Sequence, residues 1–400
     1  MTPPLVLDTE DTLPDDGFTG TLVGRAWLPT TDAAPGGPAV VVLRSDGVFD
    51  ISDVAPTMSS LLEQDDPVAT VRNAGGRRIG SLQAMLDGAP ANTGDATAHL
   101  LAPCDLQVIK AAGVTFAGSL IERVIEEQAK GDAFGAAQIR GKIRALVGDS
   151  LASIRPDSAE AHELKALLIA QGMWSQYLEV GIGPDAEIFT KAPVLSALGT
   201  GTEIGLHPRS KWNNPEPEVV LAINSRGQAL GATLGNDVNL RDFEGRSALL
   251  LGKAKDNNGS CAIGPFLRLF DDNFSLDHVR QAEVGLRVDG DDGFVLVGAS
   301  SMDQLTRDPL DLVAQTIGAT HQYPDGAMLF LGTLFAPVED RNAPGAGFTH
   351  REGDVVRIST RSLGTLVNRV GRSDRIAPWQ FGVRALINNL ALRGLLRKPL

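Results

Sequence analysis

Hydrophobic residues in the second half of the chain come in short runs that turn-forming residues separate. One run covers residues 217–223, the segment Asn224-Ser225-Arg226-Gly227 follows it, and a second run covers residues 228–234. Apolar runs of this length, bounded by glycine, asparagine and serine, are typical of β-strands. The pattern therefore predicts a β-hairpin centred near Arg226.

The same pattern continues towards the C-terminus. It predicts a second hairpin over residues 287–300, turning at Asp291-Asp292-Gly293, and single strands over residues 328–333 and 355–359. Between them, the spacing of apolar residues predicts a helix over residues 308–319. This half of the chain is therefore expected to be rich in β-structure.

The first hundred residues show strand-like runs as well. We expect strands over residues 22–28 and 39–44 and a short helix over residues 54–63. Residues 74–98 have the composition of a linker, with order suggested only over residues 79–86. The chain is therefore divided into a β-rich N-terminal domain with its linker, residues 1–98, and a C-terminal domain, residues 99–400.

A helical pattern interrupts the C-terminal domain. Leu120, Ile121, Val124 and Ile125 fall on one helical face, and residues 138–146 form a second, basic helical pattern. The segment Asp157-Ser158-Ala159-Glu160 is similar to a capping box and starts a third helix that runs to about residue 170. We therefore predict an α+β, β-rich protein with a helical insertion over about residues 118–175.

Composition and charge limit the possible partners. The net charge is −13 without a block of lysine or arginine, which argues against nucleic acid and anionic membrane surfaces. No apolar run is long enough to span a bilayer, and residues 1–10 lack the features of a signal peptide, so we expect a cytoplasmic location. Two cysteines give neither a disulfide framework nor a zinc cluster.

Three carboxylates are expected at one end of the first hairpin. Glu216 and Glu218 are two residues apart at the start of a strand, so their side chains share a face. Asp237 falls opposite residues 214–216 if the turn centres near Arg226. Three like charges in one place are costly unless a cation neutralises them, and carboxylate oxygens suit Mg²⁺, Mn²⁺ or Ca²⁺. The alternative is an exposed acidic hairpin end without a metal.

A second polar segment, residues 255–265, begins with Lys255 and is rich in glycine and asparagine. Its lysine suits an anionic ligand, although the segment alone is more typical of an ordinary surface turn. The sequence gives little support for a serine hydrolase, a phosphate-binding loop or a histidine metal site. The chain has no Gly-x-Ser-x-Gly motif, residues 245–253 have the wrong spacing for a phosphate-binding loop, and the six histidines lack metal-ligand spacing.

The order of these segments resembles the fumarylacetoacetate hydrolase superfamily. That family carries two glutamates separated by a single residue, an Asn-Asp-Val-x-x-Arg-Asp segment, and a lysine followed by a loop that ends in Gly-Pro. The matching segments here are residues 216–218, 236–242 and 255–265, with further matches at residues 190–193 and 332–333. The resemblance covers residues 101–400. It implies a mixed β-sandwich roll with a helical lid insertion and a small N-terminal accessory domain.

Within the family, residues 174–179, 213–218 and 236–247 are similar to the 2-keto-3-deoxy-pentonate dehydratases. These hydro-lyases turn 2-keto-3-deoxy-D-xylonate, the same compound as the D-arabinonate derivative, into 2,5-dioxopentanoate in oxidative pentose catabolism. One departure from the family pattern agrees with this. Ser119 stands where the family's C–C hydrolases carry a water-activating histidine, with Glu122 three residues further on. Elimination needs no such water.

The resemblance also implies roles for individual residues. Glu216, Glu218 and Asp237 would hold Mg²⁺, with Mn²⁺ or Ca²⁺ as possible substitutes and no organic cofactor. Lys255 and Glu122 would be catalytic, whereas Ser119, Lys191, Arg241 and Thr333 would bind the 2-keto acid substrate. Because members of the family usually assemble as dimers or pairs of dimers, the resemblance implies a homodimer or a homotetramer.

Two alternatives remain open from the sequence. The first is hydrolysis of the C–C bond of a 3-acylpyruvate at the same site. The second is a sugar-acid-binding protein without catalysis, which the carboxylates and Lys255 argue against. The sequence decides neither the length of the substrate chain nor its stereochemistry at C4.

Overall fold

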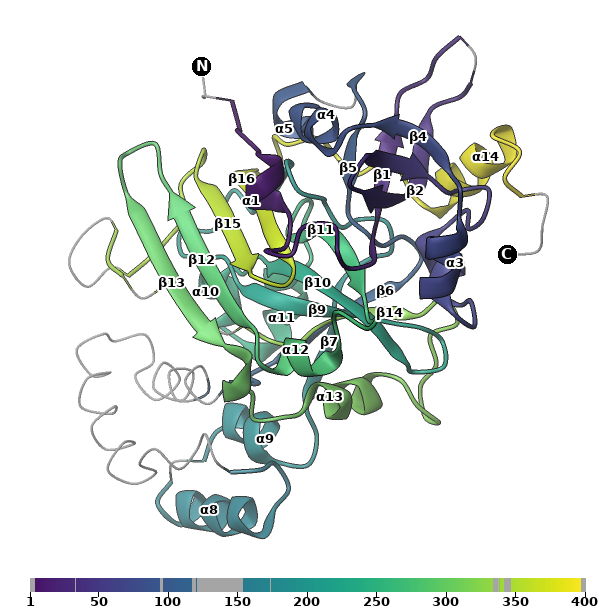
Figure 1. The fold of residues 1–400 in the computed structure, drawn as a ribbon. Coiled ribbons are helices and arrows are strands. Elements are labelled where there is room, and N and C mark those ends of the chain that lie inside the picture. The colour runs from purple at the N-terminus through teal and green to yellow at the C-terminus, as the bar shows by residue number, and fades with distance from the viewer. Residues whose placement is uncertain are drawn as a thin grey trace.

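The centre of the molecule is a long mixed β-sheet (Figure 1). The structure is a computed structural model that describes residues 4–32, 34–93, 96–116, 120, 154–172, 174–333, 337, 339–341 and 347–396. Within these residues the sheet has 11 strands. In spatial order they are β4 (Arg77–Gly80), β3 (Gly47–Asp50), β2 (Gly37–Arg44), β1 (Leu22–Leu28), β11 (Cys261–Leu269), β10 (Ala229–Asp237), β9 (Pro217–Ile223), β14 (Ala327–Phe330), β6 (Val108–Gly113) and β7 (Glu187–Ala192), with β5 (His99–Leu101) beside β1.

A second, five-stranded sheet packs against the central strands β9 and β10 (Figure 1). Its order is β13 (Val295–Ser301), β12 (Glu283–Asp289), β15 (Val355–Thr360), β16 (Gly364–Arg372) and β8 (Glu203–Leu206). Strand β12 alternates buried and more exposed positions, as expected for a strand with one face on the core.

Strand β9 is buried along its whole length, which explains its uninterrupted apolar sequence. Val219 and Leu221 pack into the core shared with the second sheet. Val220 and Ala222, on the opposite face, belong to a separate core that also contains Met58 of the N-terminal region. Both faces of the hairpin are therefore fixed by packing, which holds its polar end in place.

Short helices connect and cover the sheets. They are α1 (Thr9–Thr12), α2 (Met58–Leu62), α3 (Pro67–Asn73), α4 (Leu82–Asp87), α5 (Pro90–Thr93), α8 (Ala159–Ala170), α9 (Gln176–Ile182), α10 (Arg241–Glu244), α11 (Leu251–Lys255), α12 (Leu276–Arg280), α13 (Pro309–Thr316) and α14 (Val383–Leu392), with 3₁₀ turns at Ala248–Leu250 and Met302–Gln304. Across the described ranges, every helix is too short or too polar to cross a membrane.

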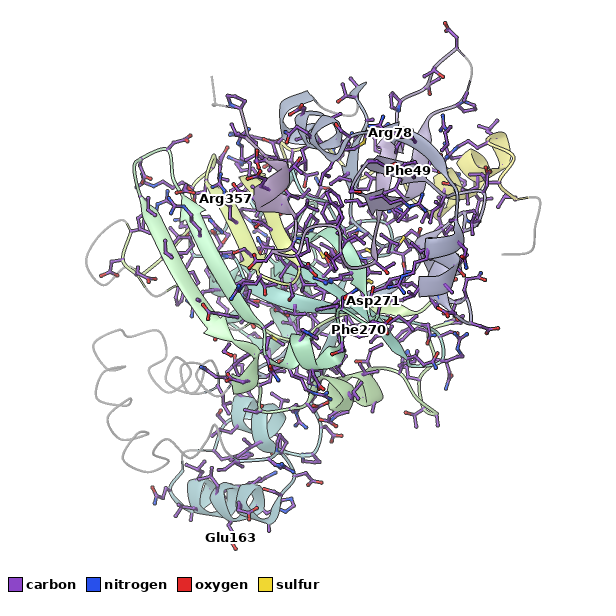
Figure 2. All side chains as sticks on the ribbon, in the orientation of Figure 1. Phe49, Arg78, Glu163, Phe270, Asp271 and Arg357 are labelled. Carbon is purple, nitrogen blue, oxygen red and sulfur yellow. The ribbon has the colours of Figure 1, made fainter. Side chains whose placement is uncertain are left out.

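The predicted elements of the C-terminal half are largely confirmed. Strands β9 and β10 form the first hairpin, and β12 and β13 form the second. Helix α8 begins after Ser158, whose side chain accepts a hydrogen bond from the backbone of Ala161, and its outward-facing Glu163 is visible in Figure 2. The helices predicted over residues 120–127 and 138–146 lie outside the described residues, Leu120 excepted.

Two regions differ from the sequence-based expectation. Residues 74–98 contain β4, α4 and α5 instead of a mostly unstructured linker. Their glycines and prolines stand at turns and helix starts, so composition alone conceals the short elements. Helix α14 was not predicted. Its Asn389 donates a hydrogen bond to the carbonyl of Gly36, which fixes the helix against the N-terminal strands.

The N-terminal strands are continuous with the C-terminal half through the pairing of β1 with β11. Asp271, labelled in Figure 2 beyond the end of β11, reinforces this junction. Its carboxylate accepts hydrogen bonds from the backbone and hydroxyl of Thr21 and forms an ion pair with Arg72. The division of the chain at residue 98 stays a prediction.

A buried ion pair stabilises the start of β15. Asp354 accepts hydrogen bonds from Nη1 and Nη2 of Arg341 at 2.6 and 2.7 Å, and Nδ1 of His350 lies 3.1 Å from its Oδ2. Burial favours the neutral acid, but the hydrogen bonds from Arg341 and His350 lower the pKa of Asp354 to about 2. The folded protein therefore keeps this carboxylate charged at acidic pH.

Replacing Asp354 with asparagine should lower the free energy of unfolding at pH 7 by about 1.5–3 kcal/mol, because the Arg341 guanidinium loses one of the two carboxylate partners that it has among the described residues and keeps only Asp292. The loss should shrink as the pH falls from about 4 towards 2, because Asp354 then takes up a proton in the unfolded wild-type protein while the folded protein still holds it charged, which removes the same stabilisation. Urea unfolding of both proteins at pH 7, 5 and 3 measures this. A difference that stays constant across the three pH values would contradict it.

Candidate active site

The end of the β9–β10 hairpin brings the three predicted carboxylates together. Glu218 pairs with Gly235 in the β-ladder, and the backbone N–H of Asp237 donates to the carbonyl of Glu216 at 3.0 Å. This register is the one expected from a turn near Arg226. Oxygen atoms of Glu216, Glu218 and Asp237 all lie within 4.8 Å of one another. The predicted convergence is therefore confirmed.

The three carboxylates are buried, with exposed fractions of 3% or less. An exposed acidic hairpin end is thus inconsistent with the structure. Burying three carboxylates side by side is unfavourable unless positive charge compensates for them. The surrounding residues show how much compensation the chain itself provides.

Lys255, at the end of α11, provides the first compensating charge. Its ammonium donates to Oε2 of Glu216 and, at 3.1 Å, to Oδ2 of Asp237. Burial by itself would lower the pKa of Lys255, but Asp237 and Glu216 outweigh it and raise the pKa above its ordinary value. The lysine is therefore held protonated between two of the carboxylates.

Lys191, on β7, provides a second charge from behind Asp237. Its side chain is fully buried, and Nζ lies 2.8 Å from Oδ1 of Asp237. The same ammonium donates to the backbone carbonyls of Val238 and Lys255. These contacts anchor Asp237 and the end of α11 to the same lysine.

The Glu218 carboxylate is stabilised by a backbone hydrogen bond instead of a lysine. Its Oε2 accepts a hydrogen bond of 2.7 Å from the backbone N–H of Gly332, and among the described residues it forms no ion pair with a lysine or arginine. Burial, with the negative charges of Asp237 and Glu216, raises the pKa of Glu218 well above its usual range. Three carboxylates therefore face two ammonium groups, and Glu218 is the one whose ionised form is most disfavoured.

Two asparagines hold the acidic side chains and the backbone of this site in place. Nδ2 of Asn239 donates to Oε1 of Glu216 at 3.0 Å and to Oε2 of Glu244 at 2.6 Å. Oδ1 of Asn236 accepts from the backbone N–H of Glu216 at 3.2 Å. Such contacts behind a set of carboxylates are typical of metal sites, where they fix the direction of each ligand.

A small cavity opens beside the carboxylates. It is lined by Ala112, Gly113, Val114, Glu187, Phe189, Glu216, Glu218, Asp237, Glu244, Leu251, Lys255 and Thr333. Glu216, Glu218, Asp237 and Lys255 therefore line this cavity together with Thr333. The substrate-binding role of Thr333 stays a prediction. The site has both carboxylates and an ammonium facing one space, which suits a ligand that carries oxygen atoms.

The structure brings the other predicted residues less directly to the cavity. Lys191 and Arg241 are absent from its described lining, and the Arg241 guanidinium stacks 4.6 Å from the Trp212 ring centre. Ser119 and Glu122 lie outside the described residues. The roles proposed for these four residues stay predictions.

The cavity is also lined by two acidic residues, Glu187 and Glu244, that the sequence analysis did not identify. Glu244 stands on α10, three residues after Arg241, and shares Asn239 with Glu216. Its position in the polar segment that follows Asp237 could have identified it from the sequence as a residue near the site. Glu187 begins β7, far from the other ligands in sequence, and no spacing pattern identifies it.

Replacing Gly332 with alanine should disrupt the site. Gly332 has φ +102°, and a Cβ there would lie 1.8 Å from Oγ1 of Thr115, whose hydroxyl donates to the carbonyl of Leu331. We expect the unfolding free energy to fall by about 1–3 kcal/mol, because the new methyl group overpacks this position. We also expect weaker metal binding, because the backbone N–H that donates to Glu218 is displaced. Gly252, which has open space around it, is the matched control. Equal effects of the two substitutions in thermal melts would contradict this.

The segment that carries the site matches a known protein family. Residues 178–371 match the model of the fumarylacetoacetate (FAA) hydrolase C-terminal domain. This part of the chain, which carries all three carboxylates and Lys255, is therefore similar to the C-terminal domain of that family.

Curated relatives narrow the comparison. A 2-dehydro-3-deoxy-D-arabinonate dehydratase of Saccharolobus solfataricus is 28% identical over 190 residues, which cover 48% of this chain and 60% of that protein. A probable 2-keto-3-deoxyxylonate dehydratase of Haloferax volcanii is 29% identical over 198 residues, or 50% and 64% of the two chains. The matched region thus spans less than two thirds of either relative.

Solved structures support the predicted fold class. A 2-keto-3-deoxy-D-arabinonate dehydratase in its apo form superposes with a TM-score of 0.61 at 19% identity, covering 88% of this chain and 99% of that one. The same enzyme complexed with magnesium and 2,5-dioxopentanoate gives a TM-score of 0.60. The β-rich architecture of two mixed sheets predicted from the family resemblance is confirmed.

Proposed function

We propose that this protein is a divalent-metal-dependent hydro-lyase that converts a 2-keto-3-deoxy-pentonate into 2,5-dioxopentanoate. The observation that carries the proposal is the buried set of Glu216, Glu218 and Asp237 beside the protonated Lys255, all lining one cavity. The names of the two curated relatives support the same reaction.

The residues present fit a magnesium ion. Three carboxylate oxygens within 4.8 Å of one another form a hard donor set, and the raised pKa of Glu218 shows that its ionised form lacks the positive charge that a metal would supply. Glu216, Glu218 and Asp237 would hold the ion. When bound, the ion supplies Lewis acidity that polarises the C2 ketone of a 2-keto acid and so acidifies the protons at C3.

Lys255 then acts on the developing charge. Its pKa is raised, so at neutral pH it carries a proton and donates hydrogen bonds. An ammonium beside the C2 oxygen stabilises the enolate that forms when a C3 proton leaves. The same protonation makes Lys255 unsuitable as the base that removes this proton, so we assign that role to Glu122, which the sequence places in the lid insertion.

The remaining steps need proton transfers only. The C4 hydroxyl leaves as water after protonation, which gives a C3–C4 double bond conjugated with the C2 ketone. A proton shift from C5 then converts the C5 alcohol into the terminal aldehyde. Thr333, which lines the cavity, and Ser119 are proposed to bind the substrate carboxylate and hydroxyls.

Ser119 in place of a histidine supports elimination over the hydrolysis of a 3-acylpyruvate. We extend the proposal to oxidative pentose catabolism as the metabolic setting, with a homodimer or homotetramer as the working form. Light scattering after gel filtration measures that form, and a monomer would contradict this part of the proposal.

A coupled assay tests the reaction. The protein is incubated with Mg²⁺, a 2,5-dioxopentanoate dehydrogenase and its cofactor, across a panel of five- and six-carbon 2-keto-3-deoxy acids and 3-acylpyruvates. We expect cofactor reduction with a 2-keto-3-deoxy-pentonate and its loss on addition of EDTA. Activity that persists without divalent metal, or that appears only as 3-acylpyruvate cleavage, would overturn the proposal.

A further inference from the structure

A second, larger cavity lies away from the carboxylates, between strand β1, the segment 195–199 and the C-terminal segment 376–381. Its volume of about 410 Å³ is in the range of small-molecule sites. Among the described residues, its lining has no member in common with the lining of the catalytic cavity. The two spaces are therefore separate.

A buried cation lines this cavity. Arg25 is 6% exposed, and its Nη1 donates to the backbone carbonyl of Cys104 at 2.6 Å. Its Nε lies 3.5 Å from Oδ2 of Asp105. The Asp105 oxygens, however, already accept backbone N–H groups from Met58, Ser59 and Leu106.

Within the described part of the chain, Nη2 of Arg25 makes no hydrogen bond. A guanidinium has five N–H donors in a planar fork, and a buried group of this kind is normally satisfied by oxygen atoms. An arginine at a cavity wall with an unused donor therefore points to an anionic ligand, with a carboxylate as the best geometric match.

Aromatic side chains form other parts of the wall. Trp27 follows Arg25 by two residues on β1, so both side chains lie on the same face, and its ring meets Phe381 edge-on at 5.6 Å. Trp379, 46% exposed, stands on the C-terminal segment, where its backbone N–H donates to Oδ1 of Asn258. These rings favour a planar, apolar body.

Glu203 also lines the cavity and limits the charge of a ligand. A second carboxylate on the ligand would meet its negative charge in a partly enclosed space. We propose that this cavity binds a small monocarboxylate with a planar, apolar body, its carboxylate on Arg25 and its body against Trp27 and Trp379. The site goes beyond the proposed catalytic function and does not depend on it.

Calorimetric titration with benzoate, against the neutral isostere benzamide, tests this site. The full-length protein should bind benzoate saturably and benzamide at least about tenfold more weakly, since a charge-assisted hydrogen bond is lost. Arg25→Met should weaken benzoate binding by a similar factor, whereas Arg361→Met, at a side chain 89% exposed, should leave it unchanged. Absence of saturable binding, or equal affinity for the two compounds, would overturn the proposal.

Two further variants locate the bound benzoate. Ala197→Leu, which fills the cavity from its wall, should abolish binding, whereas Glu216→Ala, in the catalytic cavity, should preserve it. The reverse result would assign benzoate to the catalytic cavity and contradict the proposal. If Arg25→Met does not fold by circular dichroism, the benzoate–benzamide comparison and Ala197→Leu decide the question on folded proteins.

Discussion

Glu218→Gln should abolish metal-dependent turnover and at the same time raise the melting temperature of the metal-free protein. The substitution removes one of the three carboxylates that we propose hold the metal, so we expect activity to fall by at least roughly 100-fold, the upper range seen for residues that merely orient ligands. It also removes a buried carboxyl group whose pKa is raised by burial and by Asp237 and Glu216, a group that destabilises the fold at neutral pH. An amide oxygen can still accept the N–H of Gly332.

Thermal melts with EDTA and with Mg²⁺ measure both effects. In EDTA the variant should melt about 2 °C or more above the wild type, because relief of the buried repulsion stabilises the fold. Mg²⁺ should raise the melting temperature of the wild type and affect the variant much less. Glu283→Gln, at an exposed position on β12, is the control and should change neither property. A variant that is less stable than wild type in EDTA would contradict the account of the site.

Lys255→Met should lower kcat by about 10²–10³-fold, because the enolate oxygen loses the ammonium that stabilises it. The substitution also leaves Glu216 and Asp237 without one compensating charge. We therefore expect the metal-free variant to be less stable than wild type, the opposite of Glu218→Gln.

The matched control is Lys253→Met, two residues earlier on the same helix and exposed to solvent. It should keep wild-type kcat and stability. Steady-state kinetics with a 2-keto-3-deoxy-pentonate and urea unfolding in EDTA distinguish the variants. A Lys255→Met protein with raised KM but unchanged kcat would show that the lysine binds substrate without acting on the reaction.

The hairpin could be predicted from the sequence because its information is local. The run at 217–223, the turn near Arg226 and the return strand set the register, and the register brings Asp237 opposite Glu216. The second hairpin and helix α13 were predictable for the same reason. The pairing of β1 with β11, in contrast, joins segments more than 200 residues apart, and no local pattern encodes it.

The convergence of the three carboxylates was predictable, but the positions of the residues around them were less so. Carboxylate spacing and the family resemblance identify Glu216, Glu218 and Asp237, whereas burial and direction of side chains come only from the structure. Lys191 shows the difference. Its sequence segment suggested contact with a substrate, and the structure puts its ammonium behind Asp237. Glu187 reaches the cavity only because β7 is the strand next to β6 in the sheet.

We propose that the buried carboxylate site performs dehydration and not C–C cleavage. ¹³C NMR of the products formed from uniformly labelled 2-keto-3-deoxy-D-xylonate, with Mg²⁺ and with EDTA, distinguishes the two reactions. We expect a single five-carbon product, 2,5-dioxopentanoate, that forms only with the metal. Two labelled fragments, or the five-carbon product at an equal rate in EDTA, would contradict this proposal.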